Sequence, residues 1–130
     1  MQANFSVLVE PLENGIRSVR IVGELDAATV PELSETLKGL VDADPDKIMV
    51  DLTDCEFIDS TGLAALVHSR SAVVDDADGR FVICCAEEQV DRLLEITGLR
   101  EAFGVLGTRE DAIASFNVES SEDSSFDSIS

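Results

Sequence analysis

Residues 48–63 read IMVDLTDCEFIDSTGL, and this stretch decides the fold. It opens with a nearly continuous apolar run, Ile48 to Leu52, which is typical of a short strand buried on both faces. After a polar connection it reaches Asp59-Ser60-Thr61-Gly62, where small polar residues precede a new apolar pattern. That pattern predicts a helix extending to about Val74. The apolar residues on or near one face of this helix are Leu63, Leu66, Val67, Val73 and Val74.

The segment before this stretch predicts a hairpin followed by a helix. Phe5 to Glu10 alternates loosely, and Ile16 to Val22 has the composition of a second strand. Asn14-Gly15 between them is a strong turn signal, so the two strands are expected to pair. The helix is expected to have Thr29 as its N-cap and Pro31 in its first turn. Its apolar residues recur with a 3.6-residue period: Val30, Leu33, Leu37, Leu40 and Val41.

The segment after the stretch continues the alternation of strands and helices. Phe81 to Cys85 predicts another buried strand, and Glu87 to Thr97 predicts a helix with Gly98 as its C-terminal cap. A short strand near Phe103 to Leu106 and a last helix capped by Thr108 complete the chain. The predicted order is β-β-α-β-α-β-α-β-α. Such alternation indicates a single α/β domain with a mixed, mostly parallel sheet flanked by about four helices.

Composition divides the chain into a folded part and a tail. A chain of 130 residues with 45% apolar residues can build one well-packed core, which we place in residues 1–116. Residues 117–130 contain six serines and four acidic residues, a composition typical of a disordered tail. No N-terminal signal pattern is present, so a cytoplasmic location without membrane insertion is expected. The three cysteines lack framework spacing and indicate free thiols, with adjacent Cys84 and Cys85 pointing to opposite faces of a strand.

The charge of the chain limits its partners. The formal net charge is −18, so DNA, RNA and anionic membranes would be repelled. Such a charge favours solubility and protein partners with basic patches. The sequence therefore argues against a nucleic-acid-binding function.

The sequence contains little that could support catalysis. His68 is the single histidine, and it has no partner at the spacing of a nucleophile–base pair. Neither paired Cys/His spacing for zinc nor a glycine-rich nucleotide loop occurs, so no cofactor and no bound metal are expected. Asp51, Asp54, Glu56 and Asp59 form an acidic cluster that suits a solvated loop better than an ion site. A metal-dependent hydrolase built on three of these aspartates would lack a nucleophile–base pair, so we expect a protein that is not an enzyme.

Ser60 has the local chemistry of a phosphorylation site. It stands at the start of a predicted helix, where backbone N–H groups have no helical partner and the dipole favours an anion. Gly62 is expected to leave the approach open, and Asp59 places a second negative charge beside the site. Ser60 or Thr61 is equally suited to cap the helix, so these residues alone leave both interpretations open.

Three blocks of sequence resemble the STAS domain family, and within it the anti-sigma factor antagonists. The first is Gly23-Glu24-Leu25-Asp26 ahead of a helix, which resembles the strand-to-helix turn of the family. The second runs from Val50 to Leu63 and resembles the phosphorylation segment of the family. The third runs from Leu93 through Thr97-Gly98-Leu99 to Phe103. Together the blocks cover roughly residues 5–116, and their order and spacing carry the resemblance.

The resemblance implies a partner switch that regulates transcription. The unphosphorylated antagonist binds an anti-sigma factor that is also a serine kinase, and a sigma factor is released. The kinase, which supplies ATP and magnesium, then phosphorylates Ser60, and a separate serine phosphatase resets the protein. The positions that match the binding segment of the family are Asp26, Asp59, Ser60, Thr61, Gly62 and Leu63. The alternative is a non-switching STAS scaffold, either a sensory-complex component or an accessory subunit of a lipid transporter.

Overall fold

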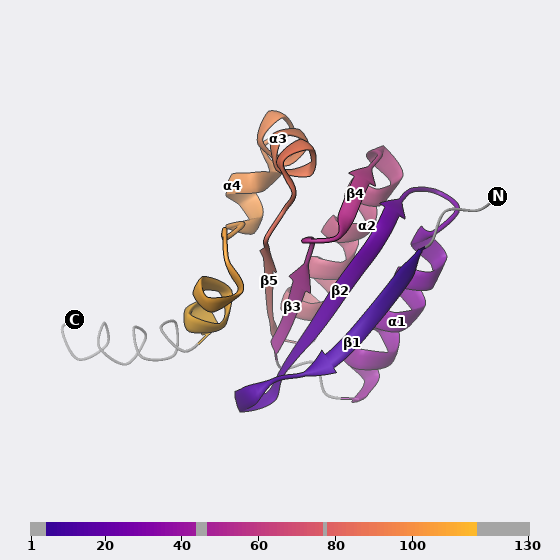
Figure 1. Ribbon diagram of the computed structural model, residues 1–130. Helices are drawn as coiled ribbons and strands as arrows, with labels where there is room; N and C mark the ends of the chain where they lie inside the picture. The colour runs from indigo at the N-terminus through magenta and orange to yellow at the C-terminus, as the bar shows by residue number, and fades with distance from the viewer. Residues whose placement is uncertain (1–4, 44–46, 77, 117–130) are drawn as a thin grey trace.

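The computed structural model describes residues 5–43, 47–76 and 78–116, and its centre is a five-stranded sheet (Figure 1). The strands are β1 (Ser6–Pro11), β2 (Ile16–Leu25), β3 (Lys47–Asp51), β4 (Cys55–Ile58) and β5 (Arg80–Cys84). Their order is β1-β2-β3-β5, and β4 pairs with the end of β2. β1 and β2 are antiparallel and the other pairs are parallel, which confirms the predicted mixed, mostly parallel sheet.

Helical segments lie on both faces of this sheet (Figure 1). They are the 3₁₀ turn η1 (Glu13–Gly15), α1 (Val30–Ala43), α2 (Ser60–Arg70), the π-helical continuation η2 (Ser71–Asp76), α3 (Glu88–Ile96) and α4 (Leu99–Phe103). A further helix covers residues 109–116. Its predicted cap is confirmed, because the Thr108 Oγ1 accepts a hydrogen bond from the Asp111 N–H at 3.0 Å. The α/β class and the layered architecture follow the sequence prediction.

Two hydrophobic cores occupy the two faces of the sheet. Ile48 and Val50 in β3 face α1 and α2, whereas Met49 between them faces the helix of residues 109–116. Alternate side chains of a strand point to opposite faces, so both faces must be apolar when both are covered. This arrangement explains why residues 48–52 read as a continuous apolar run.

The element order departs from the prediction at two places. Residues 103–106 do not form a strand, because α4 extends to Phe103 and only Leu106 forms a single parallel bridge, with Cys84. Gly98 and Gly104, with φ of +80° and +65°, bound α4, a short helix that the sequence did not predict. The expected polar connection before Asp59 instead contains strand β4, whose ends Cys55 and Ile58 are buried against β2.

The two adjacent cysteines also differ from expectation. β5 ends at Cys84, and Cys85 adopts a positive φ of 65°, so the two sulfur atoms lie 3.2 Å apart instead of on opposite faces. All three cysteines are free thiols, as predicted. Burial raises the pKa of the Cys84 thiol, and it raises the pKa of Cys55 to about 11. These two thiols therefore remain protonated near neutral pH and behave as small apolar groups.

The predicted tail, residues 117–130, lies outside the described residues. Within the described residues, none of the helices combines the length and the apolar composition that a membrane span requires.

Candidate functional site

The site is built where two neighbouring parallel strands end. Leu25 at the end of β2 pairs with Ile58 at the end of β4, and the Asp59 N–H donates to the Leu25 carbonyl at 3.2 Å. Asp26 and Asp59 therefore leave the sheet at the same edge. Ser60 follows as the first residue of α2, and its side chain is exposed. The carboxyl ends of parallel strands are where α/β proteins commonly place their binding sites.

Asp59 is the helix cap, in place of the expected Ser60 or Thr61. Its backbone is extended, and its Oδ1 accepts a hydrogen bond from the Gly62 N–H at 2.9 Å. A carboxylate at this position also complements the positive end of the helix dipole. Since Asp59 performs the capping, the Ser60 hydroxyl has no hydrogen-bond partner among the described residues. The capping interpretation of Ser60 is therefore wrong.

Gly62 allows α2 to pack closely on the sheet and does not open a path to Ser60. It is buried, and a Cβ at this position would lie 2.5 Å from the Leu25 carbonyl oxygen and 2.9 Å from the Ile58 Cγ2. No real Cβ tolerates such distances to a backbone atom. Gly62 thus lets the first turn of α2 lie directly against the ends of β2 and β4, and this contact fixes the position of Ser60. The expectation that Gly62 leaves an open approach to the site is wrong.

Asp26 organises the neighbouring turn into α1. Its Oδ1 accepts hydrogen bonds from the Ala28 N–H at 3.0 Å and from the Thr29 N–H at 3.2 Å. The Thr29 hydroxyl accepts from the Asp26 N–H at 2.9 Å and donates to the Glu24 carbonyl at 2.8 Å. Thr29 therefore occupies the predicted N-cap position directly before α1, but its hydroxyl bonds back to the turn and not to the N–H groups of the helix. Asp26 remains half-buried, and its remaining carboxylate surface lies at the same edge as Asp59.

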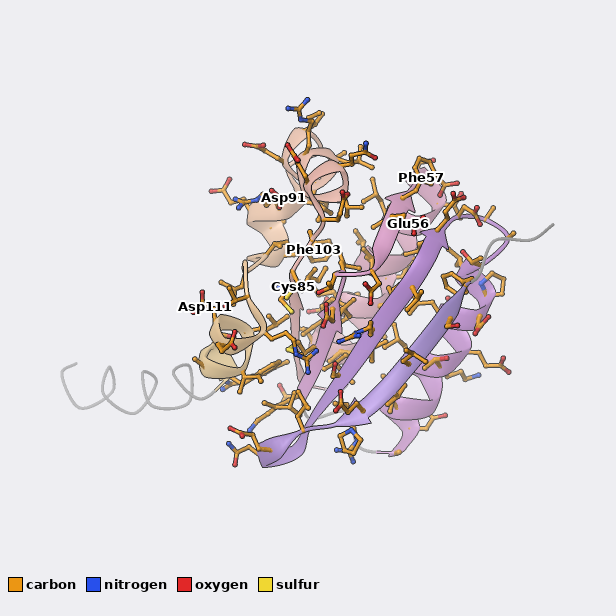
Figure 2. The ribbon with its side chains drawn as sticks, in the orientation of Figure 1. Glu56, Phe57, Cys85, Asp91, Phe103 and Asp111 are labelled. Carbon is orange, nitrogen blue, oxygen red and sulfur yellow. The ribbon has the colours of Figure 1, made fainter. Side chains whose placement is uncertain are left out.

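An apolar surface adjoins Ser60. Phe57 in β4 is 48% exposed and Val67 in α2 is 41% exposed. Ser60, Leu63 and Val67 recur at spacings of three and four residues, so they share one side of α2. Figure 2 shows Phe57 and Glu56 together at the end of β4, beside the start of α2. We call Phe57, Ser60, Leu63 and Val67 the Ser60 face.

Sequence reasoning missed two members of this face. Val67 is predicted on the buried side of its helix, yet α2 buries Ala65, Leu66 and Ser69 instead. The helix is apolar on most sides, so periodicity does not define its inner face. Phe57 is missed because the strand β4 is itself missed; in β4 the end residues Cys55 and Ile58 are buried, and Phe57 between them is exposed.

The four acidic residues of the predicted cluster do not form one site, although Asp51 and Asp54 share Arg20, whose Nε lies 3.8 Å from the Asp51 Oδ2. Asp54 is exposed and pairs with Arg20 at 3.4 Å, Glu56 is exposed, and Asp59 caps α2. Asp51 is fully buried, so the expected solvated loop is wrong for this residue.

The buried Asp51 holds the helix of residues 109–116 to the sheet. Its carboxylate accepts hydrogen bonds from the Thr53 N–H at 2.9 Å, from the Thr53 hydroxyl at 2.6 Å and from Arg109 at 2.6 Å. Burial raises the pKa of Asp51, but the hydrogen bonds from Thr53 and the charge of Arg109 outweigh it, so the pKa lies below its usual value. The thiols of Cys84 and Cys85 lie close to the carboxylate, but Arg109 opposes a cation there. This cluster is therefore structural.

Comparisons with known proteins agree with this arrangement. Residues 11–112 match the model of the STAS domain. Over 87 residues the chain is 37% identical to the anti-sigma-B factor antagonist of Staphylococcus aureus, an alignment that covers 67% of this chain and 80% of that relative. An anti-sigma factor antagonist from Mycobacterium paratuberculosis is similar in structure, with a TM-score of 0.75 and 27% identity over 86% of this chain and 93% of that one.

A fold-level likeness extends to the Bacillus cell fate determinant SpoIIAA, solved in its phosphorylated form. The TM-score is 0.65 at 18% sequence identity, over 85% of this chain and 99% of that one.

Proposed function

The chain belongs to the STAS domain family, and on this premise we propose that it is an anti-sigma factor antagonist switched by phosphorylation of Ser60. In its unphosphorylated form it binds an anti-sigma factor that is also a serine kinase, and a sigma factor is released. The kinase uses its own ATP and magnesium to phosphorylate Ser60, and the complex dissociates. A serine phosphatase restores the binding form.

One observation carries the assignment to Ser60. Its hydroxyl is exposed at the start of a rigidly packed helix, and Asp59 has taken over the capping that would otherwise occupy it. A kinase can therefore modify Ser60 without breaking a hydrogen bond of the fold. The free backbone N–H groups at the start of α2 tolerate an added phosphate, so the modification changes the surface without unfolding the helix.

The physical effect of the phosphate lies in the interface. A phosphoserine carries about −1.5 to −2 charges near neutral pH. On the Ser60 face this charge stands among exposed apolar side chains and beside Asp59, whose carboxylate repels it. Burying such a charge against a partner costs several kcal/mol in desolvation and repulsion. A difference of about 4 kcal/mol changes an equilibrium roughly a thousandfold, which suffices for a switch.

The proposed contact residues have different roles. Ser60, Thr61 and Leu63 contact the partner directly, together with Phe57 and Val67 on the same surface. Asp26 and Asp59 supply negative charge at the rim, which suits a partner with basic side chains. Gly62 acts indirectly, because its close packing sets the position of the Ser60 face.

The proposal is tested by calorimetric titration of the chain into its cognate kinase. We expect Ser60→Asp to weaken binding by a factor of ten or more, since it adds one of the charges of a phosphate to the Ser60 face. Ser60→Asn places an uncharged side chain of the same size at the same position and serves as the matched control. Equal affinity of Ser60→Asp and the unmodified chain would contradict the electrostatic switch. A chain that binds no serine kinase but joins a transport complex would favour the scaffold alternative.

A further inference from the structure

α1 and α2 lie side by side on one face of the sheet (Figure 1). Residues of both helices line a groove. Its volume is about 390 Å³, within the range of roughly 300–1,000 Å³ that small-molecule sites occupy. Val30, Leu37 and Val41 form the α1 wall, and Ala64 and Ala65 of α2 with Ala72 of η2 form the opposite wall. One end of the groove reaches Thr61, the neighbour of Ser60.

The apolar character of this groove has a basis in the sequence of α2. A helix that packs on a sheet normally has one apolar face and one polar face. In α2, Ala65 and Leu66 face the sheet, Leu63 and Val67 belong to the Ser60 face, and Ala64 lines the groove. The groove is thus a third apolar surface of the same helix, and it adjoins the Ser60 face at Thr61, which lines the groove and is also a proposed partner contact.

The charge at the groove is opposite to that of the whole molecule. The chain has 27 acidic residues and a net charge of −18, yet none of the described residues that line the groove is acidic. Lys38 of α1 and His68 of α2 both line it, and both side chains are exposed. Lys38 is one of only two lysines in the chain. An apolar groove bordered by one lysine and by an imidazole that can donate a hydrogen bond complements a ligand with an apolar body and an anionic head.

We propose that this groove binds a medium-chain fatty acid in its carboxylate form. The acyl chain lies between the valines of α1 and the alanines of α2, and the carboxylate meets Lys38 and His68 at the rim. A second copy of the chain is a poorer occupant, because it brings another net charge of −18. The proposal is independent of the switch at Ser60, and either can fail without the other.

Binding of decanoate to the full chain, below its micelle concentration, tests the proposal. We expect saturable binding by calorimetry at one site, with shifts of the Ala64, Ala65 and Ala72 methyl resonances. Decanol, which lacks the charge, and butyrate, which lacks the chain length, should each bind on the order of tenfold more weakly or worse. Ala64→Phe should abolish binding by filling the groove, with thermal unfolding used to verify that this variant is folded.

Lysine variants make the test specific. Lys38→Gln should weaken decanoate binding about tenfold and leave decanol binding unchanged. Lys47→Gln removes the same charge from the start of β3, outside the groove, and should have no effect. Three results would overturn the proposal: no saturable binding, equal affinity for decanoate and decanol, or equal losses in the two lysine variants. Binding that requires removal of residues 117–130 would also overturn it, because the tail would then be the occupant.

Discussion

At the scale of single residues, Ser60 depends on neighbours whose roles the sequence hides. A glycine and an aspartate beside a serine suggest an open, anionic loop. The structure instead assigns Asp59 to the helix cap and Gly62 to a close helix–strand contact. The cap is a local contact with Gly62 that any of the neighbouring polar residues could have supplied. The close contact at Gly62 has no sequence signature, because it depends on Leu25, which lies more than thirty positions away in the chain. The resemblance to the STAS family is confirmed, because residues 11–112 match the STAS domain.

Gly62→Ala tests the close contact under Ser60. The added methyl group must displace the Leu25 carbonyl, so we expect the free energy of unfolding to fall by about 1–3 kcal/mol. Gly39→Ala is the matched control, because it adds a methyl group in a helix interior with open space around it. That variant should gain stability by up to about 1 kcal/mol. Urea unfolding measures the free energy of unfolding of both variants. Equal values for Gly62→Ala and Gly39→Ala would contradict a close contact at Gly62.

Asp51 predicts a specific dependence of stability on pH. Its pKa is lowered in the folded state, so its contribution is complete above the unfolded pKa and is lost as pH falls through the folded pKa. At neutral pH, Asp51→Asn should cost about 3 kcal/mol, because Arg109 and Thr53 lose their anionic partner. The exposed Asp54→Asn should cost less than about 1 kcal/mol. Urea titrations give the free energy of unfolding of Asp51→Asn and of the parent chain, and the difference between the two should become smaller below pH 4. A difference that does not change with pH would argue against an ionised Asp51.

Among the helices and strands, the sequence identifies those with a long apolar pattern and misses the short ones. The apolar spacing over residues 30–41 identifies α1, and the Asn14-Gly15 turn identifies the β1–β2 hairpin. β4 has four residues and α4 has five, too few for a period to show. The helix of residues 109–116 was predicted with its cap, but its docking was not. That docking rests on Asp51 and on the second apolar face of the sheet.

Phe116→Ala tests the docking of this last helix. Phe116 is fully buried and belongs to the cluster formed with Ile16 and Met49 beneath the sheet. Its truncation should cost about 3–5 kcal/mol of unfolding free energy. Phe57→Ala removes the same side chain from a half-exposed position, so it should change stability by less than about 0.5 kcal/mol while weakening kinase binding. Thermal unfolding of the two variants measures their losses of stability. A loss in Phe116→Ala as small as that in Phe57→Ala would mean that the helix of residues 109–116 is not part of the core.

At the scale of the whole molecule, a net charge of −18 acts on stability as well as on partner choice. Like charges on a compact surface repel one another, and this repulsion opposes folding. Salt shortens the range of the repulsion from about 30 Å at 0.01 M to about 3 Å at 1 M. The same screening weakens attraction toward a basic partner.

Added sodium chloride should therefore have opposite effects on folding and on association. The midpoint of thermal unfolding should rise with salt, and the association rate with the kinase should fall. Scanning calorimetry and stopped-flow binding measure the two trends. Sucrose at matched osmolality, which screens no charge, is the control for the association rate. A midpoint that falls with salt would show that ion pairs such as Asp51–Arg109 outweigh the general repulsion.

The central claim, that Ser60 is the switched residue, is tested most directly by mass spectrometry. The purified chain is incubated with its cognate kinase, ATP and magnesium, and the phosphorylated residue is identified by fragmentation. The account predicts a gain of one phosphate on Ser60, abolished in Ser60→Ala and retained in Thr61→Val. Undiminished phosphorylation of Ser60→Ala, or a phosphate found only on another residue, would contradict it.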